Sequence, residues 1–171
     1  MMGDTKRQCI YIVDASSLII LNRFDAEVFE IPQRVWIELD RLLDDGIITS
    51  CRCVYDEIVT DSKKPDKVSA WLGPKQSHFP KPTQQQILYM AEAVNEFSGL
   101  VDPKSEKEQA DPWIVAMARE LSEINPENEY VVVTQENKNS PHKIPAACKK
   151  YGIRVINQKE FLAEVGIKLE V

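Results

Sequence analysis

The stretch Tyr130-Val131-Val132-Val133-Thr134 is apolar and mostly β-branched over four residues before it reaches a threonine. A short apolar run of this kind predicts a strand that is buried on both faces. A second run, Ile10-Tyr11-Ile12-Val13, has the same character and ends at Asp14. Neither run alternates polar and apolar residues, as a half-exposed strand would, so both are expected inside a sheet.

Helical patterns separate these strands along the chain. The best marked runs from Pro32 to Gly46, where Val35, Leu39 and Leu42 recur at helical spacing. Ile153–Ile156 predicts a further buried strand, and residues 47–48 a short extended piece. Helices are expected near residues 16–22, 32–45, 54–60, 68–72, 84–98, 111–124, 144–151 and 160–165.

Buried strands that alternate with helices predict a parallel sheet covered on both faces. The expected fold is therefore α/β: a three-layer α/β/α sandwich with a central parallel sheet, formed by one domain over residues 1–171. Ligands of such sheets bind beyond the carboxyl ends of the strands. Asp14 and residues 134–136 are expected at two of these ends.

Composition is that of an ordinary folded domain. The chain has 171 residues, of which 43% are hydrophobic and 28% charged, with a formal net charge of −6. We expect no signal peptide and no membrane span, and a cytoplasmic location in which Cys9, Cys51, Cys53 and Cys148 are free thiols. A zinc site is not expected, because the C-x-C pair at Cys51 and Cys53 lacks a second Cys/His pair.

Four acidic residues stand out, and each has a plain structural explanation beside the functional one. Asp14 follows a strand and precedes a helix, where it could be an N-cap. Asp111 before Pro112 fits an N-cap with proline in the first turn. Glu57 could be a solvated helix residue and Glu136 a loop residue. Their order along an α/β fold is the informative feature.

Carboxylates that converge without lysine or arginine partners repel one another unless a cation lies between them. Oxygen-rich pockets select hard cations such as Mg²⁺ or Mn²⁺. Asp14, Glu57, Asp111 and Glu136 are therefore the candidate metal ligands and catalytic residues. The hydroxyls of Ser16 and Thr134 are expected to support them.

The ordered set resembles the PIN domain. The matching segments are Ile-Val-Asp14-Ala-Ser-Ser-Leu-Ile, Val-Tyr-Asp-Glu57-Ile, Ala-Asp111-Pro-Trp-Ile-Val-Ala-Met-Ala and Val-Val-Thr134-Gln-Glu136. The tail Lys143-Ile-Pro-Ala-Ala-Cys-Lys-Lys-Tyr-Gly-Ile-Arg-Val-Ile is similar to an uncharacterised bacterial PIN-like subfamily. The resemblance spans nearly the whole chain and departs from the family at Glu136, where an aspartate is usual.

The resemblance implies hydrolysis of RNA phosphodiester bonds with Mg²⁺ or Mn²⁺ held by these acids. It also implies that the chain could be the toxin of a toxin–antitoxin pair, with an antitoxin protein as partner, and could form a homodimer. One alternative is a catalytically weak or inactive PIN-like module that binds RNA or protein. A phosphatase that forms an aspartyl-phosphate at Asp14 is disfavoured, because position 16 is serine where those enzymes need a second aspartate.

Basic residues are grouped locally, although the chain is acidic overall. Solvated surface lysines are one explanation of these groups, and contacts with an RNA backbone are the other. The groups are Lys63, Lys64, Lys67, then Lys75, His78, Lys81, and later Lys138, Lys143, Lys149, Lys150.

Overall fold

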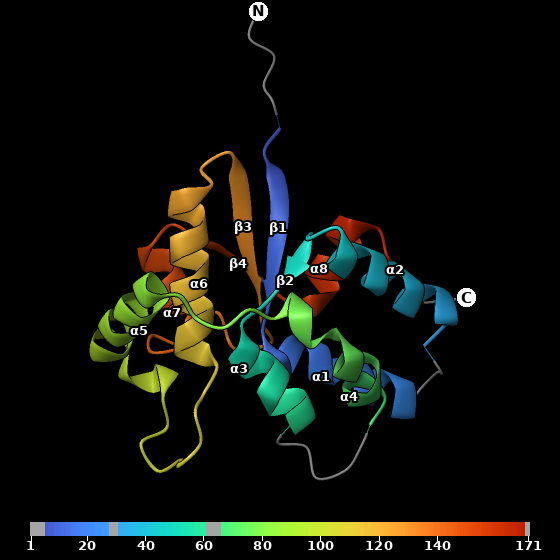
Figure 1. Cartoon of the computed structure of the whole chain (residues 1–171), viewed down its shortest axis with the longest axis horizontal. Coiled ribbons are helices and arrows are strands. Elements are labelled where there is room, and N and C mark those ends of the chain that lie inside the picture. Colours follow the sequence, from blue (N-terminus) through green and yellow to red (C-terminus); the bar gives the residue numbers. More distant parts are fainter. Residues whose placement is uncertain (1–5, 28–30, 61–65, 170–171) are drawn as a thin grey trace, which may run out of the picture.

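The computed structural model describes residues 6–27, 31–60 and 66–169. Four parallel strands form one sheet in the order β2-β1-β3-β4 (Figure 1). The strands are β1 (Gln8–Val13), β2 (Ile48–Thr49), β3 (Asn128–Val133) and β4 (Arg154–Ile156). The two longest, β1 and β3, are neighbours, with Val13 level with Val133, so their last residues lie side by side.

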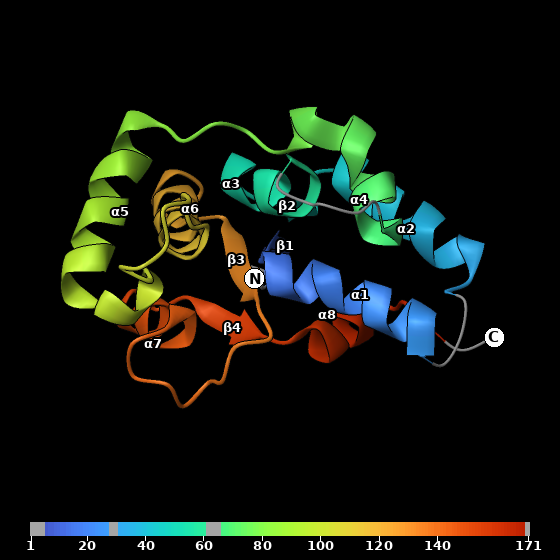
Figure 2. The same cartoon turned by 90° about the horizontal axis from the view of Figure 1, so that it is seen from below.

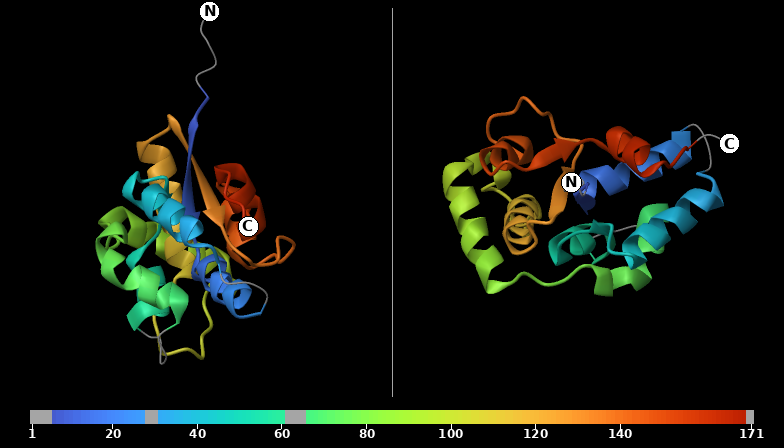
Figure 3. Two further views of the ribbon diagram at one scale, coloured as in Figure 1. Left: turned by 90° about the vertical axis from the view of Figure 1, so that its right-hand side faces the viewer. Right: turned by 90° about the horizontal axis from the view of Figure 1, so that it is seen from above.

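Helices cover both faces of the sheet, so the predicted three-layer α/β/α sandwich with a central parallel sheet is confirmed. The main helices are α1 (Ala15–Glu27), α2 (Gln33–Asp44), α4 (Lys67–Leu72), α5 (Gln84–Glu96), α6 (Asp111–Ile124), α7 (Ile144–Lys150) and α8 (Gln158–Val165). Figures 2 and 3 show α5 and α6 on one side of the strands and α1 and α8 on the other. No helix in the described ranges is long and apolar enough to cross a membrane.

The core forms where the apolar side of each helix meets the sheet. Helix α6 packs on β1 and β3, and α5 lies on the outside of α6. On the opposite face, Leu18, Leu39 and Phe161 from α1, α2 and α8 line one apolar space against Val13 and Val133. All five side chains are buried. Both long strands are therefore covered above and below, as their unbroken apolar sequence requires.

Several elements differ from the sequence prediction in their bounds. Strand β1 begins at Gln8, before its apolar run, because it pairs with β3 over six residues. Helix α8 begins at Gln158 rather than at Glu160, because Asn157 caps it and accepts a hydrogen bond from the Glu160 N–H (2.8 Å). The predicted helix over 54–60 is two elements, α3 (Arg52–Tyr55) and the π-helical turn η1 (Asp56–Thr60).

Two 3₁₀ turns, η2 (Gly73–His78) and η3 (Ser98–Leu100), were not predicted. The second follows α5, which ends at Glu96 rather than continuing to residue 98. Gly99 in this turn packs tightly against residue 142, since a Cβ on Gly99 would lie 2.6 Å from the His142 carbonyl oxygen. Only glycine fits this contact, which brings the end of α5 against the loop that follows β3.

The strand order fixes where a site can form. The chain leaves β1 for β2 on one side and returns to add β3 and β4 on the other, so the direction of connection reverses between β1 and β3. In open α/β sheets the crevice at such a switch point, beyond the carboxyl ends of the strands, is the usual ligand site. Asp14 and Thr134 are the first residues after these two strands.

Candidate acidic site

Asp14 is held at the end of β1 by both its backbone and its side chain. Its N–H donates to the Val133 carbonyl (2.9 Å), which extends the ladder with β3 by one residue. Its carboxylate oxygen Oδ2 accepts hydrogen bonds from the hydroxyls of Ser16 (2.8 Å) and Thr134 (2.6 Å). Both hydroxyls bind the same oxygen, so neither occupies Oδ1. The side chain is buried, with 4% of the residue exposed, and rigidly oriented.

Thr134 has the equivalent place at the end of β3. Its N–H donates to the Ile156 carbonyl of β4 (3.0 Å), and its hydroxyl accepts the Glu136 N–H (3.3 Å) while donating to Asp14. Thr134 therefore joins the ends of three strands to the turn that carries Glu136. The structure brings Ser16 and Thr134, expected as supporting hydroxyls, onto Asp14.

Glu57 reaches the same region from the π-helical turn η1. Its Oε1 accepts the backbone N–H of Ala110 (2.9 Å), the residue in front of α6. A π-turn contains one more residue than an α-turn, and such turns are frequent at functional sites. No periodic signal in the sequence indicated it, since Val54 and Ile58 have ordinary helical spacing.

Asp111 is not the N-cap that its Asp-Pro sequence suggested. It is the first residue within α6, and the cap position belongs to Ala110, whose own side chain makes no capping hydrogen bond. The carboxyl group lies among the other acids. Burial raises the pKa of Asp111 to about 8, together with the charges of Asp14, Glu136 and Glu57 and a hydrogen bond with Glu136.

Glu136 is anchored by a helix in the same manner as Glu57. Its Oε2 accepts the N–H of Ile144 (3.0 Å), the first residue of α7. The carboxyl group is also hydrogen-bonded to Asp111. The turn that carries Glu136 is thereby linked to both α7 and α6. Glu136 thus accepts a backbone N–H that has no partner within α7, and it also lies in the acidic site.

The four predicted acids therefore converge, from four separate segments, at the switch point. Burial and the neighbouring carboxyl groups of Asp14, Glu136 and Glu57 are the main influences on the pKa of Asp111, and each of them raises it. Hard divalent cations prefer such oxygen donors. Among residues 6–27, 31–60 and 66–169, no three Cys, His, Asp or Glu side chains are arranged so that they could hold a metal ion as they stand.

At least four of the ten residues in the predicted basic groups form ion pairs within the fold. Lys75 pairs with Asp40 (3.1 Å) and donates to the Trp71 carbonyl (2.9 Å). Lys138 pairs with Glu160 (2.8 Å), Lys150 with Glu96, and His78 with Asp44 (3.2 Å). Lys63 and Lys64 lie outside the described residues. Lys75 therefore has partners within the fold, and its contact with a nucleic acid stays a prediction.

The sequence did not predict a buried glutamine that connects α8 to the first turn of α1, next to Asp14. Gln158 is 4% exposed, and its side chain donates to the Ser17 carbonyl in the first turn of α1 (2.8 Å). A glutamine in the first turn of a helix gives no local signal of burial. Its role depends on α8 packing beside α1, which the sequence pattern does not specify.

Fold and site together define a class: an α/β/α protein with a partly buried carboxylate cluster at the switch point of a parallel sheet. Residues 11–169 match a family described as "Domain of unknown function (DUF4411)". The chain belongs to this family, and the match includes all four acids. No curated protein and no solved structure shows significant similarity to the chain.

Proposed function

We propose that the protein is a Mg²⁺- or Mn²⁺-dependent nuclease that hydrolyses phosphodiester bonds of RNA at the acidic site. The observation that carries the proposal is the position of four acids beyond the carboxyl ends of β1 and β3, where Asp14 is buried and the other three carboxyl groups raise the pKa of the half-buried Asp111. Structural carboxylates usually have cationic or N–H partners that lower the pKa, whereas strongly perturbed acids in a crevice mark functional sites. The resemblance of the ordered acids to the PIN domain supports the same chemistry.

The oxygen donors of these acids suit a hard divalent cation in their chemistry, although among the described residues the side chains would have to move closer together to hold one. Asp14 and Asp111 would bind it directly, and Glu57 would bind it directly or through a water molecule. Glu136, Thr134 and Ser16 would orient these ligands. When bound, such an ion acts as a Lewis acid on the phosphoryl group and makes a water molecule more acidic.

The protein contributes preorganisation. The Ser16 and Thr134 hydroxyls fix Oδ2 of Asp14, which leaves the orientation of Oδ1 set before any ligand arrives. Glu57 and Glu136 each use one oxygen on a backbone N–H at the start of a helix, so neither side chain must be ordered on binding. Asp111 holds a proton near neutral pH while no cation is present, because its pKa is about 8.

The RNA substrate, an antitoxin partner, a homodimer and a cytoplasmic location rest on the resemblance and on composition, and they are proposals of the same standing. The direct test is incubation of the purified full-length chain with single-stranded and structured RNA, with Mg²⁺, with Mn²⁺ and with EDTA. We expect cleavage with either ion, none with EDTA, and a loss of about 100-fold or more in Asp14→Asn, which corresponds to about 2.7 kcal/mol. Equal trace activity in wild type and Asp14→Asn would identify a contaminant and reject the nuclease.

A second candidate is an inactive PIN-like binding module. The contacts of Glu136 favour it, because its carboxyl group already bonds Ile144 of α7 and Asp111. A side chain tied in this way serves the structure of the loop as well as a site. A Mg²⁺-dependent rise in melting temperature without RNA cleavage would identify this module.

A further inference from the structure

Behind Asp14 lies a closed ring of hydrogen bonds that joins three segments: the start of α1, the turn after β3 and the start of α8. Gln158 donates from its amide nitrogen Nε2 to the Ser17 carbonyl (2.8 Å) and from its backbone N–H to Oε1 of Gln135 (2.7 Å). The Gln135 N–H donates to the Ser16 hydroxyl oxygen (3.2 Å). Ser16 in turn donates to Oδ2 of Asp14, and the Ser17 hydroxyl donates to the Asp14 carbonyl (2.6 Å).

The direction of each bond matters for Asp14. A serine hydroxyl has one proton to donate. The Gln135 N–H occupies a lone pair of the Ser16 oxygen, so the single Ser16 proton is left for the carboxylate. Gln135 is itself fixed by the first N–H of α8, an orphan donor that its side chain satisfies. The orientation of the Ser16 hydroxyl thus depends on where α8 begins.

Gln158 fixes the position at which α8 begins. Its side chain is buried at 4% exposure, and an interior amide without partners would be costly. The Ser17 carbonyl gives it one, and the same contact holds the first turn of α8 against the first turn of α1. The predicted acids and their supporting hydroxyls do not include this residue, which contacts Asp14 only through others.

We infer that Gln158 is a positioning residue for the acidic site, which sets the orientation of the Asp14 carboxylate through Gln135 and Ser16 and so tunes affinity for a divalent cation. The inference rests on the proposed function. Partners of this kind, one step removed from a metal ligand, are typically worth about 10- to 100-fold in metal affinity or activity.

The variant Gln158→Met keeps the length of the side chain and removes its donor. Gln86→Met is the matched control, because Gln86 is also a buried helix glutamine (6% exposed) whose Nε2 donates elsewhere, to Oε1 of Glu120 (3.2 Å). The probe is Mg²⁺ alone. The measured quantities are the rise in melting temperature with Mg²⁺ and the Mg²⁺ concentration that gives half of that rise, with the half-saturating Mg²⁺ concentration for RNA cleavage beside them.

We expect Gln158→Met to raise the half-saturating Mg²⁺ concentration about 10-fold and Gln86→Met to leave it unchanged, although both lower the melting temperature without metal. A double-mutant cycle separates positioning from general loosening: in a Ser16→Ala background, Gln158→Met should add little, because the relay is already broken. Equal half-saturating concentrations in Gln158→Met and wild type would overturn the inference, as would a full additional effect in the Ser16→Ala background.

If Gln158→Met does not fold, Gln135→Ala makes the same test, since the Gln135 side chain is exposed and its loss is milder. It should shift the half-saturating Mg²⁺ concentration in the same direction, and no shift would overturn the inference. A wild-type protein without any Mg²⁺ response would instead reject the metal site itself, and with it the proposed function.

Discussion

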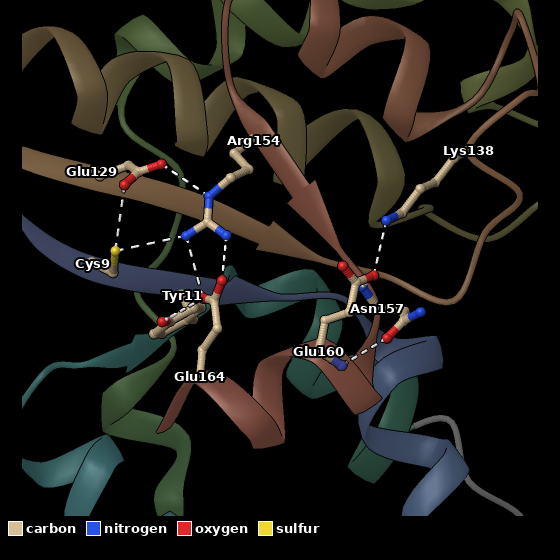
Figure 4. Close-up of polar contacts among 8 residues, drawn as sticks. All are labelled: Cys9, Tyr11, Glu129, Lys138, Arg154, Asn157, Glu160 and Glu164. Carbon is tan, nitrogen blue, oxygen red and sulfur yellow. Dashed lines mark hydrogen bonds and ion pairs between the residues drawn. The ribbon is translucent and has the colours of Figure 1, made fainter. Parts of the chain in front are cut away.

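Carboxyl groups have opposite electrostatic surroundings at the two ends of the sheet. At the amino ends of the strands, Arg154 of β4 lies between Glu129 of β3 (3.0 Å) and Glu164 of α8 (3.2 Å), beside Tyr11 and Cys9 (Figure 4). At the carboxyl ends, the acidic site contains four carboxyl groups. The hydrogen bond from Arg154 lowers the pKa of Glu164, whereas burial and neighbouring carboxylates raise the pKa of Asp111.

The comparison identifies the end of the sheet at which the folded chain itself neutralises its carboxylates. The Arg154 cluster (Arg154, Glu129 and Glu164) binds β3, β4 and α8 together and needs nothing from outside. The acidic site lowers the stability of the fold, because like charges in a partly dry pocket oppose folding, and in the proposed function a bound cation would relieve this repulsion. Three substitutions and a change of pH test whether the two ends differ in this way.

The largest effect is expected for Asp111→Asn. It removes one charge from the acidic site and leaves the helix cap alone, since Ala110 holds that position. At pH 8.5 in EDTA the variant should be more stable than wild type by at least about 1 kcal/mol, a rise of roughly 2–4 °C or more in melting temperature. Cleavage should fall about 100-fold, and Mg²⁺ should raise the melting temperature less than in wild type. Equal Mg²⁺ responses in the two proteins would remove Asp111 from the site.

The pH dependence of stability should separate the two ends. Asp111 has a pKa of about 8 in the folded protein and an ordinary value of about 3.9 when unfolded, so between these values the folded state holds a proton that the unfolded state has released. Stability without metal should therefore fall as the pH rises from about 5 to 8. The pKa of Glu164 is lowered by folding, so its contribution is present at neutral pH and is lost below about pH 4.

Thermal melts in EDTA from pH 5 to 8 test the first of these effects. Wild type should lose stability over this range, and Asp111→Asn should be nearly flat. Parallel curves for the two proteins would show that Asp111 does not titrate there.

Breaking the Arg154 cluster should cost stability alone. The Arg154 side chain is 38% exposed, so solvent screens its ion pairs and Arg154→Met should lose at most about 1 kcal/mol, a few degrees in melting temperature. Cleavage and the Mg²⁺ response should stay at wild-type values. Arg41→Met is the control, since Arg41 pairs with Glu38 and Asp45 on the surface of a single helix and holds no strands together. A changed Mg²⁺ response in Arg154→Met would mean that the two ends are coupled.

The smallest effect is expected for Lys75→Ala. Lys75 pairs with Asp40 and lies over the Trp71 ring at 5.2 Å, so it is occupied within the fold. The slope of log binding constant against log salt concentration should not change, whereas loss of a phosphate contact to single-stranded RNA would reduce it by about 0.7. A reduction of that size, measured by RNA binding at several salt concentrations, would return Lys75 to the substrate surface.

The sequence predicts most of the sheet and part of the site. Asp14 and Thr134 could be placed because both directly follow buried apolar runs, and parallel strands bring such ends together. Asp111 was predicted as a metal ligand with an N-cap as the alternative, because Asp-Pro is also typical of a cap, and only the structure shows that Ala110 takes the cap position. The Arg154 cluster was not predicted, since it depends on β4 pairing with β3 and on α8 lying beside them.

The direction of the Glu57 side chain depends on the number of residues in η1, and not only on which residues they are. Each residue of an α-helix turns the chain by about 100°, and the five residues of η1 hold one more than an α-turn would. Loss of Asp56 alone would close the turn into an ordinary helix and swing Glu57 away from the Ala110 N–H, which now lies 2.9 Å from it. All four carboxyl groups of the acidic site would still be present in such a shortened chain, yet Glu57 would face elsewhere. An alignment that scored only residue identity would still count that site as intact.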